Sequence, residues 1–464
     1  MSDRSNLIVT PSRSTDTKDR QIQAIADYIA YGIDHGCGEC VGLELEHFMV
    51  TKDGRHPVFY YGDPDLGHPG VQQVLERLRP FYKDTILETQ PDGRENLIGL
   101  SRDYAAVTIE PGAQFEISIG PVWEVGDLGI AYRAFRSELD PILDEFGFEL
   151  VALGYHPTVC AQDVQLIPKN RYRFMDEHFT NTGKHGIGMM RATASTQVSI
   201  DYDSEQDAVN KFRIANALTP LLAFVTDNSP IYEGQTVGSR LADITPMSER
   251  LSRTGMQIPY RMARTAVWND VDPQRSMTAP GTFDPGFGFA SYARTVLEGP
   301  AIFSIEHNAK GEKRSVLQKG RSFEQVFEGK ELDLWDIEHI LSLYFYDVRF
   351  KTYIEIRGAD SMPIEYALSF AAFIKGLFYD PGTVAMLARR FKDITPEDIA
   401  SAKRALTLRG YDALVYGRSA ADWLDELFAL AGDSLTAPDA PYLDALASKV
   451  AARKTLVDTY DPAL

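Results

Sequence analysis

The sequence predicts an α+β protein built around one sheet that carries acidic side chains on one face. Three stretches far apart in the chain, 41–50, 108–120 and 349–357, alternate polar and apolar residues with the two-residue period of a pleated strand. Segments with helical spacing lie between them, and 464 residues are ample for a large core. We therefore expect these strands to share one sheet with a concave, charged face.

The strands are defined by what alternates along them. In 41–50, Glu44 and Glu46 alternate with leucines. The second strand places polar side chains on one face: Glu110, Gln114, Glu116 and Ser118. The third does so with Arg349, Lys351, Tyr353, Glu355 and Arg357. A further strand is expected over 191–201, where Gln197 is on the polar face. Each strand alone is also compatible with an amphipathic edge that exposes a solvated polar face.

Helices are expected between the strands. Residues 19–33 carry an isoleucine stripe that should pack onto the sheet, and 71–79, 126–146 and 208–226 also have helical spacing. Residues 155–188 have an irregular pattern and are dense in cations. Such a loop either closes over an anionic ligand or is a solvated surface loop, and both interpretations stay open.

The chain is expected to divide into a polar leader (1–18), one large domain (19–390) and a helical C-terminal extension (391–464) packed on that domain. The extension begins with Thr395 and Pro396, a helix start with proline at the first helical position, followed by Ala- and Leu-rich helical patterns.

Composition excludes several classes of function. The formal charge is −19, from 47 basic and 66 acidic residues, which disfavours a nucleic-acid or anionic-membrane surface. No apolar run is long enough to span a membrane. Three cysteines are too few for a disulfide scaffold and are typical of a reducing cytoplasm; Cys37 and Cys40 are interpreted as small residues at a helix-to-strand junction.

The carboxylates are the main candidates for chemistry. Neither the P-loop nor the dinucleotide-binding fingerprint is present. Phosphoryl transfer needs divalent cations, carboxylates to hold them, and Arg or Lys to neutralise charge on the transferred group. The chain supplies carboxylates at Glu44, Glu46, Glu110, Glu116 and Glu355, and cations at Arg191, Arg275, Arg349 and Arg357.

Several ordered motifs resemble the glutamate-cysteine ligases of the plant and proteobacterial type. They are Gly-Leu-Glu-Leu-Glu (42–46), Ile-Glu-Pro-Gly-Ala-Gln-Phe-Glu (109–116), Pro-Lys-Asn-Arg-Tyr (168–172), Met-Met-Arg (189–191) before Thr-Gln-Val (196–198), Trp-Asn-Asp-Val-Asp (268–272), Phe-Gly-Phe (287–289) and Tyr-Ile-Glu-Ile-Arg-Gly-Ala-Asp (353–360). The resemblance covers roughly 41–380, and ordered motifs are more specific than any one alone.

The resemblance implies a glutamine-synthetase-like catalytic domain, with a curved, mostly antiparallel sheet and helices on its convex face. It implies ATP-dependent ligation of L-glutamate to L-cysteine through γ-glutamyl phosphate, the first step of glutathione biosynthesis, with ATP as co-substrate and Mg²⁺ or Mn²⁺ as the metal. A monomer or homodimer is expected, with no nucleic-acid or membrane partner. The absence of an organelle-targeting pattern predicts a cytoplasmic protein.

Site residues follow from the same resemblance. It implies metal ligation by Glu44, Glu46, Glu110, Glu116, Gln197 and Glu355. It implies catalytic roles for Arg191, Arg275 and Arg357, the first two also holding glutamate, and ATP contacts by Lys169, Arg171 and Arg349. One departure from plant members, Gly-Ala-Gln instead of Gly-Gly-Gln at 112–114, matters only if Ala113 needs a positive φ angle.

Two alternatives remain. One is a sister ligase of the same fold that joins glutamate to a different amine. The other is a nucleotide-binding regulator that has lost turnover, although every matched acidic and arginine position is occupied.

Overall fold

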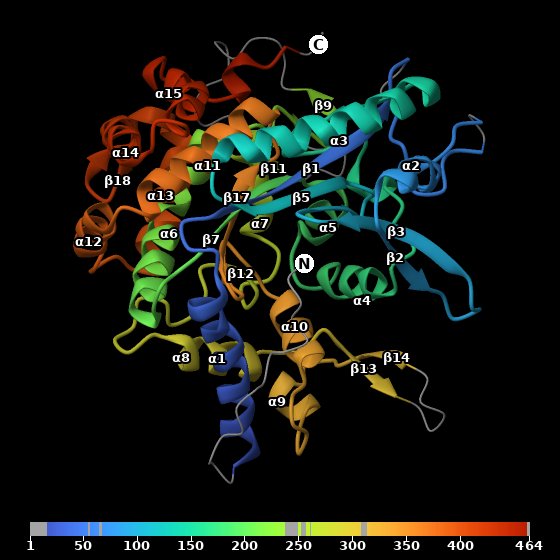
Figure 1. Cartoon of the computed structure of the whole chain (residues 1–464), viewed down its shortest axis with the longest axis horizontal. Helices are drawn as coiled ribbons and strands as arrows, with labels where there is room; N and C mark the ends of the chain where they lie inside the picture. The colour runs from blue at the N-terminus through green and yellow to red at the C-terminus, as the bar shows by residue number, and fades with distance from the viewer. Residues whose placement is uncertain are drawn as a thin grey trace.

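The computed structural model describes residues 16–53, 56–64, 67–236, 249–251, 257–259, 261–307 and 313–461. Within them, one sheet of nine strands has all its strand pairs antiparallel (Figure 1). Its order is β16 (Val348–Phe350), β17 (Ile354–Asp360), β7 (Ser195–Ile200), β1 (Val41–Thr51), β5 (Phe115–Val122), β4 (Ala105–Ile109), β3 (Glu95–Arg102) and β2 (Asp84–Thr89), with β6 (Phe148–Val151) paired to β1. The predicted α+β class and mostly antiparallel sheet are confirmed.

The remaining strands form small two-stranded pairs. These are β8 (Ile231–Tyr232) with β9 (Gln235–Thr236), β10 (Glu249–Leu251) with β11 (Gln257–Pro259), β12 (Ser276–Met277) with β15 (Phe345–Tyr346), β13 (Phe303–His307) with β14 (Lys313–Leu317), and β18 (Leu414–Val415) with β19 (Arg418–Ser419).

Helices surround the sheet. They are α1 (Thr17–His35), α2 (Val71–Leu78), α3 (Val125–Phe146), α4 (Asn170–Phe179), α5 (Gly186–Ala192), α6 (Glu205–Val225), α7 (Ala263–Trp268), α8 (Phe289–Glu298), α9 (Phe323–Val326), α10 (Leu334–Ser342), α11 (Ile364–Phe378), α12 (Pro381–Arg390), α13 (Pro396–Arg409), α14 (Ala420–Ser434) and α15 (Asp444–Ala451). No helix of the described residues is long and apolar enough to cross a membrane.

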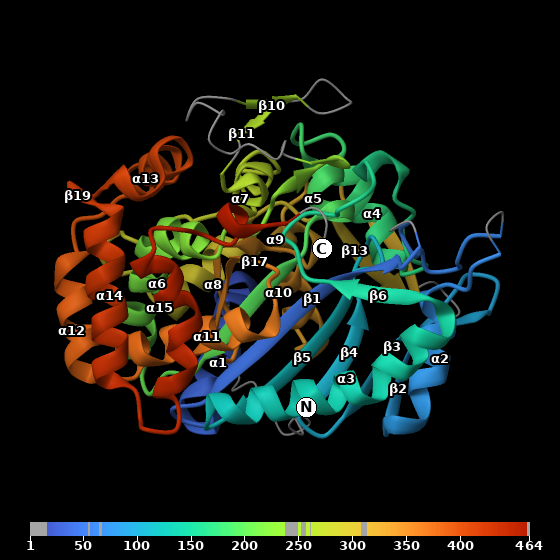
Figure 2. The same ribbon diagram turned by 90° about the horizontal axis from the view of Figure 1, so that it is seen from above.

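The long helix α3 covers one face of the sheet (Figure 2). On that face His47 of β1 contacts the Tyr132 hydroxyl of α3 at 2.9 Å, and Phe115 of β5 stacks on Phe135. Because side chains alternate along a strand, Glu44, Glu46 and Glu116 must point to the opposite face. Helices α4 and α7 lie against this part of the molecule: Tyr172 of α4 donates to Glu110 Oε2 at 3.1 Å, and Arg264 of α7 donates to the carbonyls of Gly358 and Arg357 on β17.

Two predicted single strands are hairpins instead. The stretch 108–120 breaks after Ile109 into a turn at Pro111 and Gly112, where the Ala113 amide donates to the Glu110 carbonyl at 2.9 Å. The stretch 349–357 turns after Phe350, so that Arg349 pairs across the hairpin with Glu355. Polar and apolar residues continue to alternate through both turns, so the sequence pattern did not reveal the turns.

Two more predictions are wrong in their placement. Helix α1 packs against α8 and α10 rather than onto the sheet (Figure 1). The strand predicted over 191–201 begins only at Ser195, because Arg191 belongs to the end of α5. The irregular stretch 155–188 also contains the ordered helix α4.

The C-terminal extension packs on the domain through α13 against α6 and α14 against α11. A buried ion pair joins the two parts, with Lys375 Nζ of α11 2.7 Å from Asp439 Oδ2. The boundary at residue 391 stays a prediction. Residues 1–15, most of the predicted leader, lie outside the described residues.

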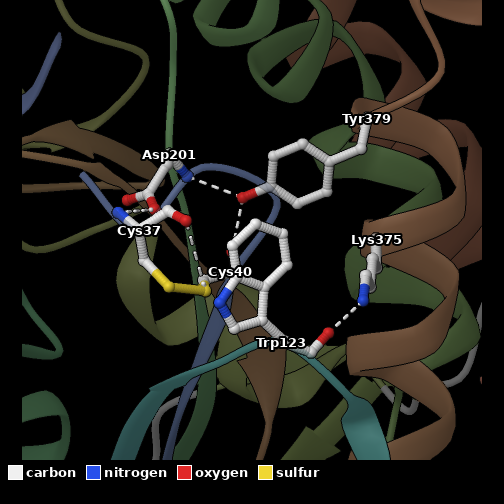
Figure 3. Close-up of a disulfide and its surroundings, with 6 residues drawn as sticks. All are labelled: Cys37, Cys40, Trp123, Asp201, Lys375 and Tyr379. Carbon is white, nitrogen blue, oxygen red and sulfur yellow. Dashed lines mark hydrogen bonds between the residues drawn. A yellow bond between two sulfur atoms is a disulfide. The ribbon is translucent and has the colours of Figure 1, made fainter. Parts of the chain in front are cut away.

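Cys37 and Cys40 form a disulfide between α1 and β1, which corrects the interpretation of two reduced small residues (Figure 3). The Cys37 amide donates to Asp201 Oδ2 at 2.8 Å, and the Tyr379 hydroxyl donates to the Cys40 carbonyl while it accepts from the Asp201 amide. Burial raises the pKa of Asp201 to about 6. The disulfide therefore lies in a network that joins the start of β1 to β7 and α11.

Candidate active site

Three carboxylates lie on the sheet face opposite α3. Glu44 and Glu46 lie on β1, and Glu116 lies directly opposite Glu46 on β5. Gln197 on β7 is the partner of Glu44 on the other side. Like charges directly opposite one another in a sheet repel, so this arrangement needs a compensating proton or cation.

Burial is the largest influence on the pKa values of these carboxyls, and neighbouring negative charges add to it. Burial, followed by the charge of Glu110, raises the pKa of Glu46 to about 7. Burial, followed by the charges of Glu44 and Glu110, raises the pKa of Glu116 well above its usual range. Burial and the charge of Glu355 raise the pKa of Glu44. The cluster is thus one in which a bound cation would favour ionisation.

Neutral hydrogen bonds position two of these groups. Ser195 donates to Glu46 from its amide at 2.7 Å and from its hydroxyl at 3.0 Å. Thr108 donates to Glu116 Oε1 at 2.5 Å. The carboxylate oxygens of Glu46 and Glu116 are ligands of the kind that Mg²⁺ prefers. Among the described residues, however, no three His, Cys, Asp or Glu side chains converge as a metal-binding group. The donor set fits a hard cation in chemistry, and its side chains would have to move inward to close around one.

Glu355 differs from the cluster because three cations surround it. It is fully buried, and Arg349 Nη2, Lys351 Nζ and Arg357 Nη1 lie 2.7, 2.8 and 2.9 Å from its oxygens. Although burial opposes ionisation, these cations hold the pKa of Glu355 well below its usual range. Both oxygens are occupied, and Arg349 is buried in the same cluster. The predicted metal role of Glu355 and ATP role of Arg349 stay predictions that this arrangement does not favour.

Arg357 connects the ion cluster to the carboxylates. It donates to Gln197 Oε1, whose amide nitrogen lies 3.4 Å from Glu46 Oε1. Arg357 thus lies at the border between the two groups. Its predicted catalytic role is compatible with this position.

Arg191 and Arg275, predicted to hold glutamate, are engaged with protein groups. Arg191 makes a bidentate pair with Asp176 at 2.8 and 2.7 Å. Arg275 is fully buried; it lies 3.2 Å from Asp272 and donates to the carbonyls of Leu343 and Pro300. Both assignments stay predictions, and neither guanidinium has its fork free for a carboxylate in this structure.

The predicted ATP contacts from the 168–172 segment lie at the start of α4. Lys169 Nζ lies 3.3 Å from the Tyr172 hydroxyl, which donates to Glu110 Oε2 at 3.1 Å. Arg171 donates to the Ser342 carbonyl and hydroxyl. Burial is the largest influence on Lys169 and lowers the pKa of its amine. Lys169 and Glu110 thus border the carboxylate cluster, while Arg171 points to α10.

A small cavity beside Arg357 is lined by Arg264, a candidate site residue that was not predicted from the sequence. Its lining includes Arg264 and Trp268 of α7. Arg264 is 5% exposed; its Nε and the Trp268 indole nitrogen are buried without a hydrogen-bond acceptor. The guanidinium lies 5.5 Å from the Trp268 ring centre. The two Nη atoms of Arg264 donate to the carbonyls of Gly358 and Arg357 at 3.3 and 3.4 Å, so Nε is the guanidinium donor that still calls for an acceptor, together with the indole N–H. The four-residue spacing on one helix was the only signal in the sequence.

The antiparallel sheet, its surrounding helices and this carboxylate-lined face define the class of fold that glutamate-cysteine ligases share. A crystal structure of glutamate-cysteine ligase from Francisella tularensis, in complex with AMP, is similar in fold, with a TM-score of 0.50 over 90% of this chain and 83% of that one at 12% identity. The family model "Glutamate-cysteine ligase family 2 (GCS2)" matches residues 40–440. The chain belongs to this family, which confirms the resemblance.

Curated relatives agree with the family. Glutamate-cysteine ligase B, chloroplastic, from Oryza sativa subsp. japonica is 29% identical over 402 residues, 85% of this chain and 73% of the relative. Glutamate-cysteine ligase, chloroplastic, from Arabidopsis thaliana is 28% identical over 383 residues, 80% of this chain and 66% of the relative. The prediction of a cytoplasmic location is wrong on this comparison, because these relatives are named chloroplastic.

Proposed function

We propose that this protein joins L-glutamate to L-cysteine with ATP, giving γ-glutamylcysteine, the dipeptide from which glutathione is made. A γ-carboxylate oxygen of glutamate attacks the γ-phosphorus of ATP and ADP leaves. The cysteine amine then attacks the acyl carbon, phosphate leaves, and the amine loses a proton. Family membership and the relatives' names support this reaction.

One observation carries the proposal in the structure: a cavity with unsatisfied arginine and indole donors adjoins a face of mutually repelling carboxylates. Arg357 lines the cavity and also contacts Gln197, which contacts Glu46. The cavity suits the carboxylate end of an amino acid, and the acidic face suits divalent cations that carry the ATP phosphates.

The cation we propose is Mg²⁺, held by Glu44, Glu46 and Glu116 with Glu110 beside them. When bound it neutralises phosphate charge during transfer. The chain's own residues do the rest: Arg264 binds the substrate carboxylate, Arg357 lies between substrate and carboxylates, and Lys169 neutralises phosphate charge.

The test is ADP release with ATP, Mg²⁺ and L-glutamate, comparing L-cysteine with 2-aminobutyrate, other amino acids and simple amines. We expect cysteine-dependent turnover and a product with the mass of γ-glutamylcysteine. Arg264→Lys keeps the charge but loses the Nε donor, so we expect the KM for glutamate to rise at least about tenfold with the KM for ATP unchanged. Turnover with another amine alone would identify a sister ligase, and none with any acceptor would identify a regulator.

A further inference from the structure

The C-terminal extension contributes a side chain to the Arg264 cavity. Lys403 lies on α13, is 4% exposed and lines the cavity. Its ammonium lies 2.6 Å from Asp347 Oδ2 and 3.5 Å from Asn269 Oδ1. A buried lysine is costly unless it is paired, so Asp347 accounts for its stability without a ligand.

The cavity therefore holds charges of both signs. Arg264, Lys403 and Arg357 are cationic, Arg357 being paired with Glu355, and Asp347 is the anionic residue among the lining side chains. The backbone fixes Asp347, since its carbonyl accepts from the Arg357 amide at 2.9 Å and its amide donates to the Met277 carbonyl at 2.8 Å. An α-amino acid carries a carboxylate and an ammonium on one carbon, and this charge set is complementary to that pair.

We propose that Lys403 and Asp347 are specificity-determining residues that recognise the α-carboxylate and α-ammonium of the amino-acid substrate. The inference rests on the proposed function and extends it to the C-terminal helices. On binding, the substrate carboxylate pairs with Lys403 and Arg264 while its ammonium pairs with Asp347. The internal ion pair is exchanged for two pairs with the ligand, so no charge in the cavity is left unpaired.

The charge pattern also sets what is rejected. Glutarate lacks the ammonium and would leave Asp347 without its new partner, and 4-aminobutyrate lacks the α-carboxylate and would leave Lys403 on Asp347. Binding sites built for a polar group discriminate strongly against analogues that lack it. The same site then explains why a free amino acid, and not any carboxylic acid, would be activated.

The test compares Lys403→Met with the wild-type protein in steady-state kinetics. We expect the KM for L-glutamate to rise at least about tenfold while the KM for ATP changes less than about twofold. The inhibition constant of 4-aminobutyrate should not rise, because that compound has no α-carboxylate for Lys403. Asp347→Asn removes the proposed partner of the ammonium, so it should weaken L-glutamate binding without weakening inhibition by glutarate.

Lys375→Met is the matched control, because it breaks another buried Lys–Asp pair that holds the C-terminal extension but lies outside the cavity lining. It should leave the selectivity for L-glutamate over both analogues unchanged. If Lys403→Met fails to fold, the double variant Lys403→Met/Asp347→Leu removes both charges together. It should weaken L-glutamate more than either analogue, since L-glutamate loses two partners and each analogue loses at most one.

Equal weakening of L-glutamate and 4-aminobutyrate in Lys403→Met would overturn the inference, since a general loosening of the site acts on both. Unchanged glutamate kinetics would overturn it as well, with the proposed function intact. If the wild-type protein does not turn over glutamate, the proposed function fails separately. Calorimetric titration with α-amino acids then decides: binding that is lost in Lys403→Met supports the inference, and its absence or persistence contradicts it.

Discussion

Two groups of carboxylates lie on the same sheet and have opposite environments. Glu355 is surrounded by Arg349, Lys351 and Arg357, and the pKa of its carboxyl is held well below the usual range. Glu46 and Glu116 are paired across two strands, and burial, followed by the charges of neighbouring carboxylates such as Glu110, raises their pKa values. One group is internally neutralised and the other is not. The acidic residues of the sheet thus divide into an ion cluster that is neutralised within the protein and a set without such counter-charges.

The largest effect that tests this contrast between the two groups is expected at Glu355. Replacing it with Gln leaves the buried Arg349 and the partly buried Lys351 and Arg357 without their counter-charge, so we expect a loss of about 3 to 5 kcal/mol in unfolding free energy. Urea unfolding measures it. Glu145→Gln, in an exposed pair with Arg77 at 2.6 Å, is the control and should leave stability nearly unchanged. A Glu355→Gln protein of wild-type stability without turnover would restore Glu355 to the metal ligands.

Glu46→Gln tests the group without internal counter-charges, through the pH dependence of the unfolding free energy. Because the folded pKa of Glu46 is about 7 against a usual 4.5, the folded wild-type protein holds a proton that the unfolded chain has released between these values. Wild-type stability from this group therefore falls as pH rises from about 4.5 to 7. Glu46→Gln should gain relative stability over that range, reaching about 1 to 3 kcal/mol at pH 8 without metal.

Unfolding free energies of both proteins from pH 4.5 to 8 measure this difference. Mg²⁺ should reduce the difference in unfolding free energy at pH 8, because a cation bound to the carboxylates stabilises the folded wild-type protein. Glu145→Gln is the control of opposite sign, because Arg77 lowers the pKa of Glu145. A pH-independent difference between wild type and Glu46→Gln would show that Glu46 is an ordinary ionised carboxylate.

The strands and the acidic face were predictable from sequence because a two-residue period in β1 leaves little choice of face. The hairpin turns were not, since residues such as Lys351 and Tyr353 keep the alternation through the turn. The location of the acidic positions followed from that pattern, but their division into two groups depends on which cations pack against them. Arg264 and Lys403 come from helices distant in sequence, and only tertiary packing brings them to one cavity.

The smallest predicted effect concerns the turn that carries Glu110 toward Glu116. Ala113 has a φ of 67°, so the departure from glycine falls on a position that needs a positive φ. Ala113→Gly should raise the unfolding free energy by about 1 kcal/mol, the left-handed penalty less the added freedom of the unfolded chain.

Gly112→Ala is the matched opposite, because a Cβ there would lie 2.1 Å from the Arg191 carbonyl oxygen, a backbone atom of α5. It should lower stability by more than Ala113→Gly raises it, and thermal unfolding of the two variants measures both. Ala113→Gly should also leave the Mg²⁺-dependent gain in stability unchanged, since it relieves the turn without moving Glu110. A loss of that gain would show that the strained turn itself positions the carboxylates, and that the acidic face depends on backbone geometry as well as on charge.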